Sequence, residues 1–260
     1  MLPEALRGLA DRPSTAAVLV DFDGSVSAIV DDPAAATVLP EARAALGALA
    51  ERIGLVGVVS GRPVEFLARA LSLPALTLVG QYGLERAVDG QVVVDPQAQP
   101  YLPAVAAAAA ELADELPGLL VERKAGVAVT VHWRTTSGRE EEAIAVAERV
   151  ATDHGLAIHP TRMARELRPP VPVDKGTAVE ALLEGCRAAC FAGDDRGDLH
   201  AFDALDRMRE RGALDTAVKI AVRSAEVPRE LLDRADIGVD GPPGLVGVLE
   251  ALVSEIDGPR

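Results

Sequence analysis

The chain has 260 residues, of which 49% are hydrophobic, and its formal net charge at pH 7 is −14. This hydrophobic share is enough for a substantial packed core, so the composition excludes a disordered chain. The acidic balance argues against a nucleic-acid-binding surface, which needs clustered lysine and arginine. An anionic substrate would therefore need a locally positive pocket or a bound cation.

The N-terminal stretch MLPEALRGLADRP lacks the basic start and apolar core of a secretory signal. The chain also has no apolar run long enough to span a bilayer. We therefore expect a cytoplasmic protein with no membrane or nucleic-acid partner. As a separate expectation, we take the protein to be a monomer. Two thiols alone make a poor zinc site, so we predict that Cys186 and Cys190 are small core residues.

Residues 16–20, AAVLV, predict a short buried strand that ends at two aspartates. Ligands of a parallel α/β sheet bind beyond the carboxyl ends of its strands. Asp21 and Asp23 can both point into such a site, while Phe22 faces the other way and packs. One aspartate can attack phosphorus, and the other can protonate the leaving oxygen. A polar strand end with an Asx turn remains the alternative explanation of this stretch.

Residues 41–54 have helical spacing and lead into a second predicted buried strand, 55–59. Ser60, at the end of this strand, can donate a hydrogen bond to a phosphate oxygen, and Arg62 offers a charged fork. Gly61 permits close approach of the backbone. On these residues alone, an ordinary strand-to-helix turn with a serine cap is the better explanation.

Residues 76–85 predict a third strand followed by a turn. From about residue 99 the pattern changes to a helix, two antiparallel strands, a second helix and one or two further strands. This block interrupts a repeated strand–helix pattern. We therefore predict a small α/β domain, residues 99–168, inserted into a core formed by residues 1–98 and 169–260.

The return to the core is marked by Asp174, a candidate N-cap, and by Lys175 in the first turn of the helix that follows. A cation in this position opposes the helix dipole, which suggests that the lysine serves a ligand. A solvated surface lysine is the commoner alternative.

Residues 188–192 predict another buried strand, followed by three carboxylates within five residues: Asp194, Asp195 and Asp198. Without compensation these groups would repel one another, and a divalent cation relieves that repulsion. The alternative is a helix N-terminus enriched in aspartate. The remaining residues predict two further strands and closing helices.

In order and separation, four stretches resemble the motifs of the haloacid dehalogenase (HAD) superfamily: Asp21-Phe22-Asp23-Gly24-Ser25, Ser60-Gly61-Arg62, Asp174-Lys175-Gly176 and Gly193-Asp194-Asp195. A closer resemblance, to the trehalose-6-phosphate phosphatase family, covers nearly the whole chain and is carried by VDFDGSVSAIVDDPAAA, GQYGLE, VERKAGVAVTVHWR and ELRPPVPVDKG. It implies an α/β fold, with a Rossmann-like parallel-sheet HAD core and a smaller inserted α/β cap domain. It also implies a Mg²⁺-dependent phosphatase that hydrolyses trehalose 6-phosphate through an aspartyl phosphate.

The same resemblance implies roles for individual residues. Asp21 would be the nucleophile and Asp23 the general acid/base. The phosphoryl oxygens would be bound by Ser60, Gly61 and Lys175. Mg²⁺ would be ligated by Asp21, the backbone carbonyl of Asp23 and Asp194, with Asp195 and Asp198 either ligating it or supporting its ligands. The disaccharide would be surrounded by Arg62, Glu122, Lys124, His132, Arg134 and Glu166.

Three positions depart from the family pattern. Ser25 replaces the usual threonine and keeps its hydroxyl group, whereas Gly197 and Leu199 stand where the fourth motif usually has threonine and glutamate. One hydroxyl and one carboxylate near the metal are therefore missing. Two alternatives stay open: a HAD phosphatase of a related phosphorylated disaccharide or pseudo-sugar, and a catalytically impaired regulatory protein that binds a sugar phosphate.

Overall fold

The structure is a computed structural model that describes residues 1–30, 35–134, 136, 138–161, 163–224 and 227–258. Part of the first family-like stretch, residues 31–34, lies outside the described residues. The chain divides into two compact units, Met1–Val92 with Val173–Arg260, and Val93–Pro172. The predicted insertion, 99–168, lies within the second unit.

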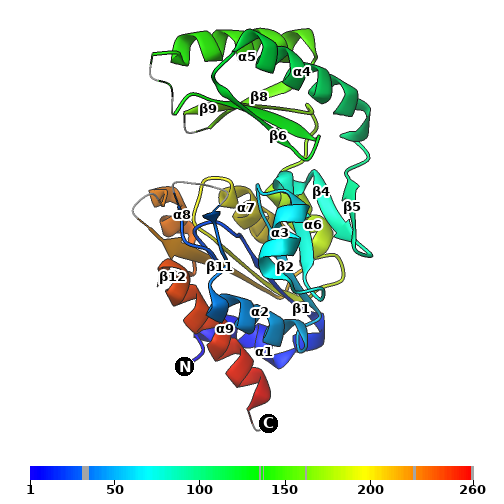
Figure 1. The fold of residues 1–260 in the computed structure, drawn as a ribbon. Helices are drawn as coiled ribbons and strands as arrows, with labels where there is room; N and C mark the ends of the chain where they lie inside the picture. Colours follow the sequence, from blue (N-terminus) through cyan, green and yellow to red (C-terminus); the bar gives the residue numbers. More distant parts are fainter. Residues whose placement is uncertain (31–34, 135, 137, 162, 225–226, 259–260) are drawn as a thin grey trace. The chain divides into compact units, whose positions relative to one another are not determined.

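Within the described residues, the larger sheet has eight strands in the order β12-β11-β10-β1-β2-β3-β4-β5 and lies in the first unit, except for the last two residues of β5 (Figure 1). Its strands are β1 (Ala16–Val20), β2 (Leu55–Val59), β3 (Thr77–Gly80), β4 (Glu85–Val88), β5 (Gln91–Val94), β10 (Ala188–Gly193), β11 (Thr216–Arg223) and β12 (Ile237–Asp240). The helices of the first unit are α1 (Arg7–Asp11), α2 (Pro40–Ala50), α3 (Val64–Leu71), α6 (Lys175–Leu182), α7 (Asp198–Glu210), α8 (Arg229–Arg234) and α9 (Gly241–Asp257). The strands from β12 to β3 pair in parallel, and β4 pairs antiparallel with β3. This parallel sheet confirms the predicted Rossmann-like α/β core.

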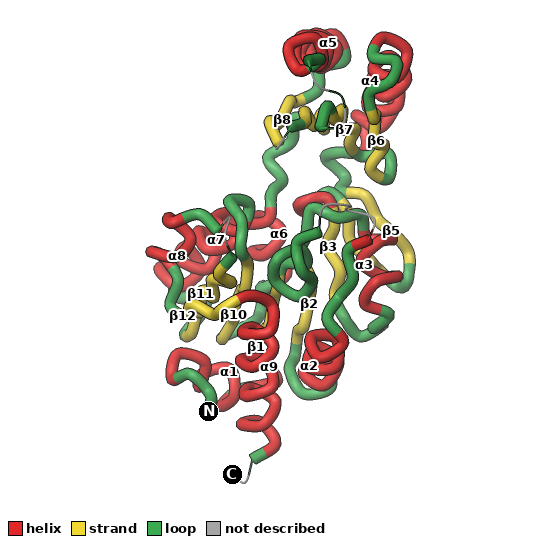
Figure 2. The backbone as a smooth tube through the Cα atoms, turned by 60° about the vertical axis from the view of Figure 1, so that its left-hand side comes forward, coloured by secondary structure: helices red, strands yellow, loops and turns green. Residues whose placement is uncertain are grey.

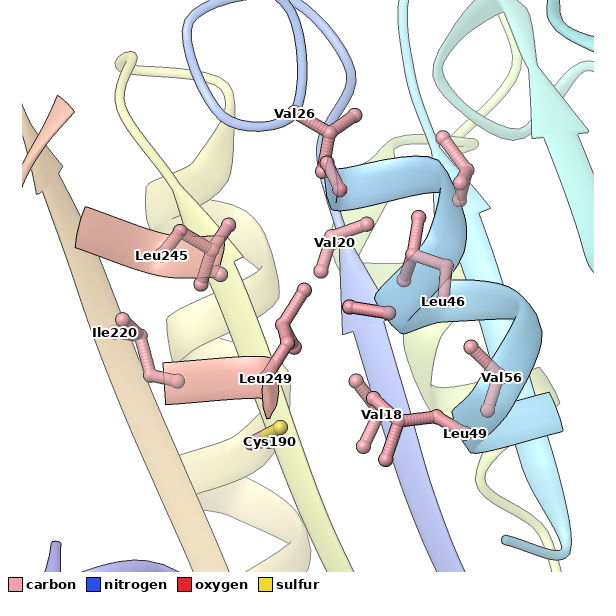
Figure 3. Close-up of a cluster of buried hydrophobic side chains, with 14 of the residues drawn as sticks. Val18, Val20, Val26, Leu46, Leu49, Val56, Cys190, Ile220, Leu245 and Leu249 are labelled. Atoms are coloured by element: carbon pink, nitrogen blue, oxygen red, sulfur yellow. The ribbon is translucent and has the colours of Figure 1, made fainter. Parts of the chain in front are cut away.

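The side chains of β1 alternate between two hydrophobic layers, one on each face of the sheet. Ala16, Val18 and Val20 pack with residues of α2 and α9, as Figure 3 shows for the two valines. Ala17 and Leu19 belong to a second cluster with residues of α6 and α7. Burial on both faces explains why the strand sequence is apolar without interruption. The first polar side chain after it, Asp21, therefore emerges at the carboxyl end of the sheet.

The two cysteines are free thiols, and Cys190 is a core residue as predicted. Cys190 is buried in the layer that contains Val18 (Figure 3). Cys186 is partly buried and packs against the opposite layer. Among the described residues, no helix combines the length and the apolar character that crossing a lipid bilayer requires.

The second unit is an antiparallel sheet in the order β6-β7-β9-β8, with two helices on one side of it (Figures 1 and 2). Its elements are α4 (Leu102–Glu115), β6 (Leu120–Lys124), β7 (Ala128–His132), α5 (Glu140–Asp153), β8 (Ala157–Thr161) and β9 (Ala164–Arg168). Val129, Val131 and Leu167 pack with the helices in one cluster. Because strand side chains alternate, Thr130 and Glu166 project from the opposite face of the sheet.

Candidate active site

The parallel pairing of β1 with β10 brings two of the acidic motifs to one edge of the sheet. Val20 is in register with Ala192, and the Asp21 N–H donates a 2.8 Å hydrogen bond to the carbonyl of Ala192. Asp21, Asp194 and Asp198 are buried, and each offers one oxygen within 4.8 Å of the others. These three carboxylates form the acidic cluster of the site.

Two glycines make room for this cluster. A Cβ atom at Gly24 would lie 2.0 Å from Asp194 Oδ2, and the backbone φ of Gly24 is +74°. A Cβ atom at Gly193 would lie 2.2 Å from Asp198 Cγ. Both distances are shorter than any real carbon contact, so only glycine lets the two loops approach the carboxylates this closely.

Lys175 lies inside the acidic cluster. Its Nζ donates to Asp198 Oδ1 at 2.6 Å and lies 3.0 Å from Asp21 Oδ1, and its side chain is 2% exposed. Burial alone lowers the pKa of this lysine, but the carboxylates of Asp198 and Asp21 raise it well above its usual value. The alternative of a solvated surface lysine is therefore wrong. The helix begins as predicted, because the side chain of Asp174 accepts a 2.8 Å hydrogen bond from the Thr177 N–H.

Asp198 and Asp195 have different surroundings. Asp198 Oδ2 accepts hydrogen bonds from the backbone N–H groups of Asp194 at 2.9 Å and Asp195 at 3.0 Å. Asp195 is exposed, and its Oδ1 accepts a 3.1 Å bond from the Asp198 N–H. Among the described residues, Asp198 and not Asp195 belongs to the group that could hold a metal ion.

The acidic cluster has the properties of a site for a hard cation. Burial raises the pKa of Asp21 to about 7; Lys175 opposes this rise, and Asp195 and Asp194 add to it. Burial, together with the charges of Asp198 and Asp195, raises the pKa of Asp194 to about 8. Asp194 Oδ1 is buried without a hydrogen-bond partner among the described residues, and Asp21 Oδ1 has only its ion pair with Lys175. Buried oxygen donors that repel one another fit Mg²⁺.

The second motif lies at the end of β2, beside the acidic cluster in the sheet order. Ser60 is buried, and its Oγ accepts a 3.3 Å hydrogen bond from the Arg62 N–H. A Cβ atom at Gly61 would lie 2.5 Å from the Cζ atom of Tyr82, so a larger residue here would have to displace the tyrosine ring. Arg62 Nε and Nη2 each lie 2.7 Å from an oxygen of Asp23. The predicted sugar-binding arginine thus pairs with the predicted acid/base residue.

The other five predicted sugar-binding residues lie in the second unit, and four of them form two pairs. Lys124 Nζ lies 2.5 Å from Glu166 Oε2, and the Glu166 side chain is 2% exposed. His132 Nε2 lies 2.9 Å from Glu122 Oε2. Arg134 follows the end of β7 and is exposed.

Strand register places further polar residues on the same sheet face as these pairs, and the sequence analysis missed them. Glu122 is opposite Thr130, Thr130 is opposite Glu166, and Glu166 is opposite His159. Thr130 Oγ1 donates a 3.4 Å bond to Glu166, and Arg168 Nη2 lies 3.2 Å from His159 Nδ1. The alternation of side chains within each strand predicts which residues share a face of the sheet. Which residues lie side by side across the four strands depends on the strand register.

Glu85, in the first unit, was also missed by the sequence analysis. Its side chain is buried, and its Oε2 accepts a 3.1 Å hydrogen bond from the Val64 N–H at the start of α3. Burial raises the pKa of this carboxyl. The signal was present in the stretch GQYGLE, whose glutamate had no assigned role.

The parallel sheet, with carboxylates at the ends of β1 and β10, defines a class of fold. A haloacid dehalogenase-like hydrolase from Bacteroides thetaiotaomicron matches it with a TM-score of 0.63 and 14% identity, over 91% of this chain and 99% of that one. A trehalose-6-phosphate phosphatase related protein matches with a TM-score of 0.75 and 24% identity, over 91% of this chain and 96% of that one. The fold is that of the HAD-like hydrolases, as predicted.

Sequence comparison narrows this class to one family. The trehalose-phosphatase family matches residues 19–233, and the chain belongs to this family. A trehalose-phosphate phosphatase of Mycobacterium avium (strain 104) is 35% identical over 258 residues, which cover 89% of this chain and 65% of the relative. The chain thus spans just under two thirds of the length of this curated relative.

Proposed function

We propose that this chain is a Mg²⁺-dependent phosphatase that hydrolyses trehalose 6-phosphate to trehalose and phosphate through an aspartyl phosphate. The ion pair of Asp21 with Lys175 carries this proposal, because it joins a buried nucleophile to a buried cation that can bind a phosphoryl group. Membership of the trehalose-phosphatase family and the activity named for the Mycobacterium avium relative support the substrate.

In the first step, Lys175 and the Ser60 hydroxyl bind phosphoryl oxygens while a carboxylate oxygen of Asp21 attacks phosphorus. The bond from phosphorus to the sugar oxygen breaks, and Asp23 protonates that oxygen as trehalose leaves. In the second step, Asp23 accepts a proton from a water molecule that attacks the same phosphorus. Inorganic phosphate leaves, and Asp21 is regenerated.

Mg²⁺ fits the acidic cluster, and we propose that Asp21, Asp194 and the backbone carbonyl of Asp23 hold it. When bound, it would neutralise charge on the phosphoryl group. Asp198 already accepts hydrogen bonds from Lys175 and from two backbone N–H groups. We therefore assign Asp198 to orienting Lys175 and the loop that carries Asp194.

We propose that the second unit selects the sugar, as the cap domain predicted for residues 99–168. Its polar sheet face presents charged and hydroxyl groups of the kinds that bind sugar hydroxyls, including Glu122, Lys124, His132 and Glu166. Arg134 is exposed and remains a predicted contact. A cytoplasmic monomer that acts on a small sugar phosphate remains our proposal.

A substrate panel tests the proposed function. Purified protein is assayed for phosphate release from trehalose 6-phosphate, sucrose 6-phosphate and glucose 6-phosphate, with Mg²⁺ and with a chelator. We expect release that needs Mg²⁺ and is fastest with trehalose 6-phosphate. Faster release from another sugar phosphate would keep the chemistry and change the substrate.

One observation favours the regulatory alternative enough to test it. Gly197 and Leu199 remove a hydroxyl and a carboxylate that the family usually has beside the metal. A Cβ atom at Gly197 would lie 3.1 Å from Asp195 Oδ1, close to the acidic loop. Binding of trehalose 6-phosphate without phosphate release, with release gained in Gly197→Thr/Leu199→Glu, would identify a binding protein.

A further inference from the structure

The bidentate ion pair of Arg62 with Asp23 packs against an aromatic ring. A bidentate pair fixes both the position and the plane of a carboxylate. The side chain of Arg62 is 18% exposed and that of Asp23 is 38% exposed. The arginine is the more buried partner, so contacts around Arg62 can restrain the Asp23 carboxylate.

Phe66 provides that packing. The Arg62 guanidinium carbon lies 4.6 Å from the centroid of the Phe66 ring, over its face. The edge of one ring meets the face of the other between Phe66 and Phe22, with centroids 5.5 Å apart and planes at 88°. Phe22 is fully buried and lies between Asp21 and Asp23 in the chain. The ring of Phe66 thus contacts both the arginine and the segment that carries the two aspartates.

The helix that carries Phe66 is itself held in place. Val64, Leu67 and Leu71 form its buried face, and all three belong to the core layer that contains Val18. The buried carboxylate of Glu85 accepts a hydrogen bond from the first N–H group of this helix. Phe66 therefore extends from a fixed helix, which suits it to orient a neighbouring side chain.

We propose that Phe66 is a positioning residue for the acid/base step: its ring fixes Arg62, and Arg62 fixes the carboxyl group of Asp23. The inference rests on the proposed phosphatase function. In the step concerned, the bond between phosphorus and the sugar oxygen breaks and its electron pair stays on that oxygen. A proton from Asp23 neutralises the oxygen while the bond from Asp21 to phosphorus forms. Without the ring, Arg62 has more rotamers available, and Asp23 is held less often in the reactive geometry.

Leaving groups of different acidity test this role. Trehalose needs a proton to leave, whereas nitrophenolate leaves without one, so only the first reaction depends on a well-placed acid. For Phe66→Leu we expect kcat/KM to fall about tenfold with trehalose 6-phosphate and less than about twofold with p-nitrophenyl phosphate. Phe66→Tyr keeps the ring face and should restore both values. Since kcat/KM reports steps up to loss of the leaving group, hydrolysis of the aspartyl phosphate does not enter the comparison.

A second variant controls for a general loss of stability. Leu73 is partly buried against the same core layer as Phe66 and lies beyond the end of α3. Leu73→Val should lower the melting temperature but change kcat/KM for the two esters by the same factor. The positioning role would be wrong if Phe66→Leu lowered kcat/KM for the two esters by the same factor. It would also be wrong if Leu73→Val lowered kcat/KM for trehalose 6-phosphate selectively, to the same degree as Phe66→Leu.

An NMR measurement tests the contact without relying on activity. The Arg62 Hε resonance should be shifted upfield by the ring of Phe66 and should move downfield in Phe66→Leu; no change would contradict the proposal. Failure of the function has a different signature. A wild-type protein that hydrolyses neither ester contradicts the phosphatase proposal. If the wild-type protein is active but Phe66→Leu lowers kcat/KM equally for both esters, only the positioning role is contradicted.

Discussion

Lys175 Nζ lies 3.0 Å from Asp21 Oδ1, and both side chains are buried at the carboxyl end of the sheet. Two further carboxylates lie near the same amine, Asp198 at 2.6 Å and Asp195 at 4.0 Å. Its charge therefore compensates the buried carboxylates around it, and we propose that it also binds a phosphoryl group.

Replacing Lys175 by methionine should reduce both stability and turnover. The substitution leaves the Asp21 and Asp198 carboxylates buried without their cation, a change that costs about 3–5 kcal/mol in comparable pairs. Urea denaturation in the presence of a chelator measures this loss. Adding Asp198→Asn to Lys175→Met should recover part of the stability but none of the phosphate release. Full stability in the single variant would contradict the buried ion pair.

Stabilisation by Mg²⁺ should increase with pH. The pKa values of Asp21 and Asp194 are raised to about 7 and about 8, so the folded protein without a metal holds protons there that the unfolded chain releases. The stability that these groups contribute is complete below their unfolded pKa values near 4 and is lost as pH rises through 7 to 8. Because a cation replaces those protons, the melting-temperature gain on adding Mg²⁺ should be larger at about pH 9 than at about pH 6.

Two controls belong to this experiment. Asp194→Asn should remove most of the Mg²⁺-dependent gain and part of its dependence on pH. Calorimetry in two buffers of different ionisation enthalpy should detect proton release on Mg²⁺ binding at neutral pH. A gain that is the same at both pH values would contradict a metal site made from these carboxylates.

Gly24→Ala and Gly90→Ala form a matched pair. The backbone φ is +74° at Gly24 and +76° at Gly90, but only Gly24 has Asp194 at 2.0 Å from the position of a Cβ atom. Gly90→Ala should cost about 1–2 kcal/mol of stability, the strain of a left-handed residue, and leave phosphate release unchanged. Gly24→Ala should cost more and should weaken Mg²⁺ binding, measured by calorimetry. Equal effects of the two substitutions would contradict the close approach of these loops.

Glu166→Gln should weaken binding of the sugar. Its buried carboxylate faces Lys124 across 2.5 Å, and removing the charge alters a group proposed to bind sugar hydroxyls. We expect KM for trehalose 6-phosphate to rise about tenfold, with kcat changed less than KM and with p-nitrophenyl phosphate hydrolysis unaffected. Glu111→Gln, which alters a carboxylate on α4 bonded to Arg149 and His154, is the control and should leave every value unchanged.

The sequence was sufficient wherever local pattern alone decides the structure. The apolar run 16–20 is the strand β1, and Asp174 is the N-cap of α6, because each depends on neighbouring residues only. Parallel order then brings the ends of β1 and β10 together, so the approach of Asp21 to Asp194 could also be predicted. The burial of Lys175 was harder to predict, because it depends on contacts that form only in the folded protein.

Features that depend on tertiary contacts could not be read from the chain. Asp195 and Asp198 carry the same chemical group three positions apart, and the fold alone decides which one enters the acidic cluster. Arg62 pairs with Asp23 and also contacts the ring of Phe66 on a separate helix, and neither contact follows from the local sequence. Thr130 joins Glu166 through strand register, which single-strand periodicity does not specify.

The role of Asp21 as nucleophile is tested by measuring phosphate release from trehalose 6-phosphate by the wild-type protein and by Asp21→Asn, each with Mg²⁺ and with a chelator. The variant keeps the shape of the side chain and removes the nucleophile. We predict release by the wild-type protein with Mg²⁺, none with chelator, and at least about a thousandfold less by Asp21→Asn. Release by Asp21→Asn at the wild-type rate would contradict transfer of the phosphoryl group to Asp21.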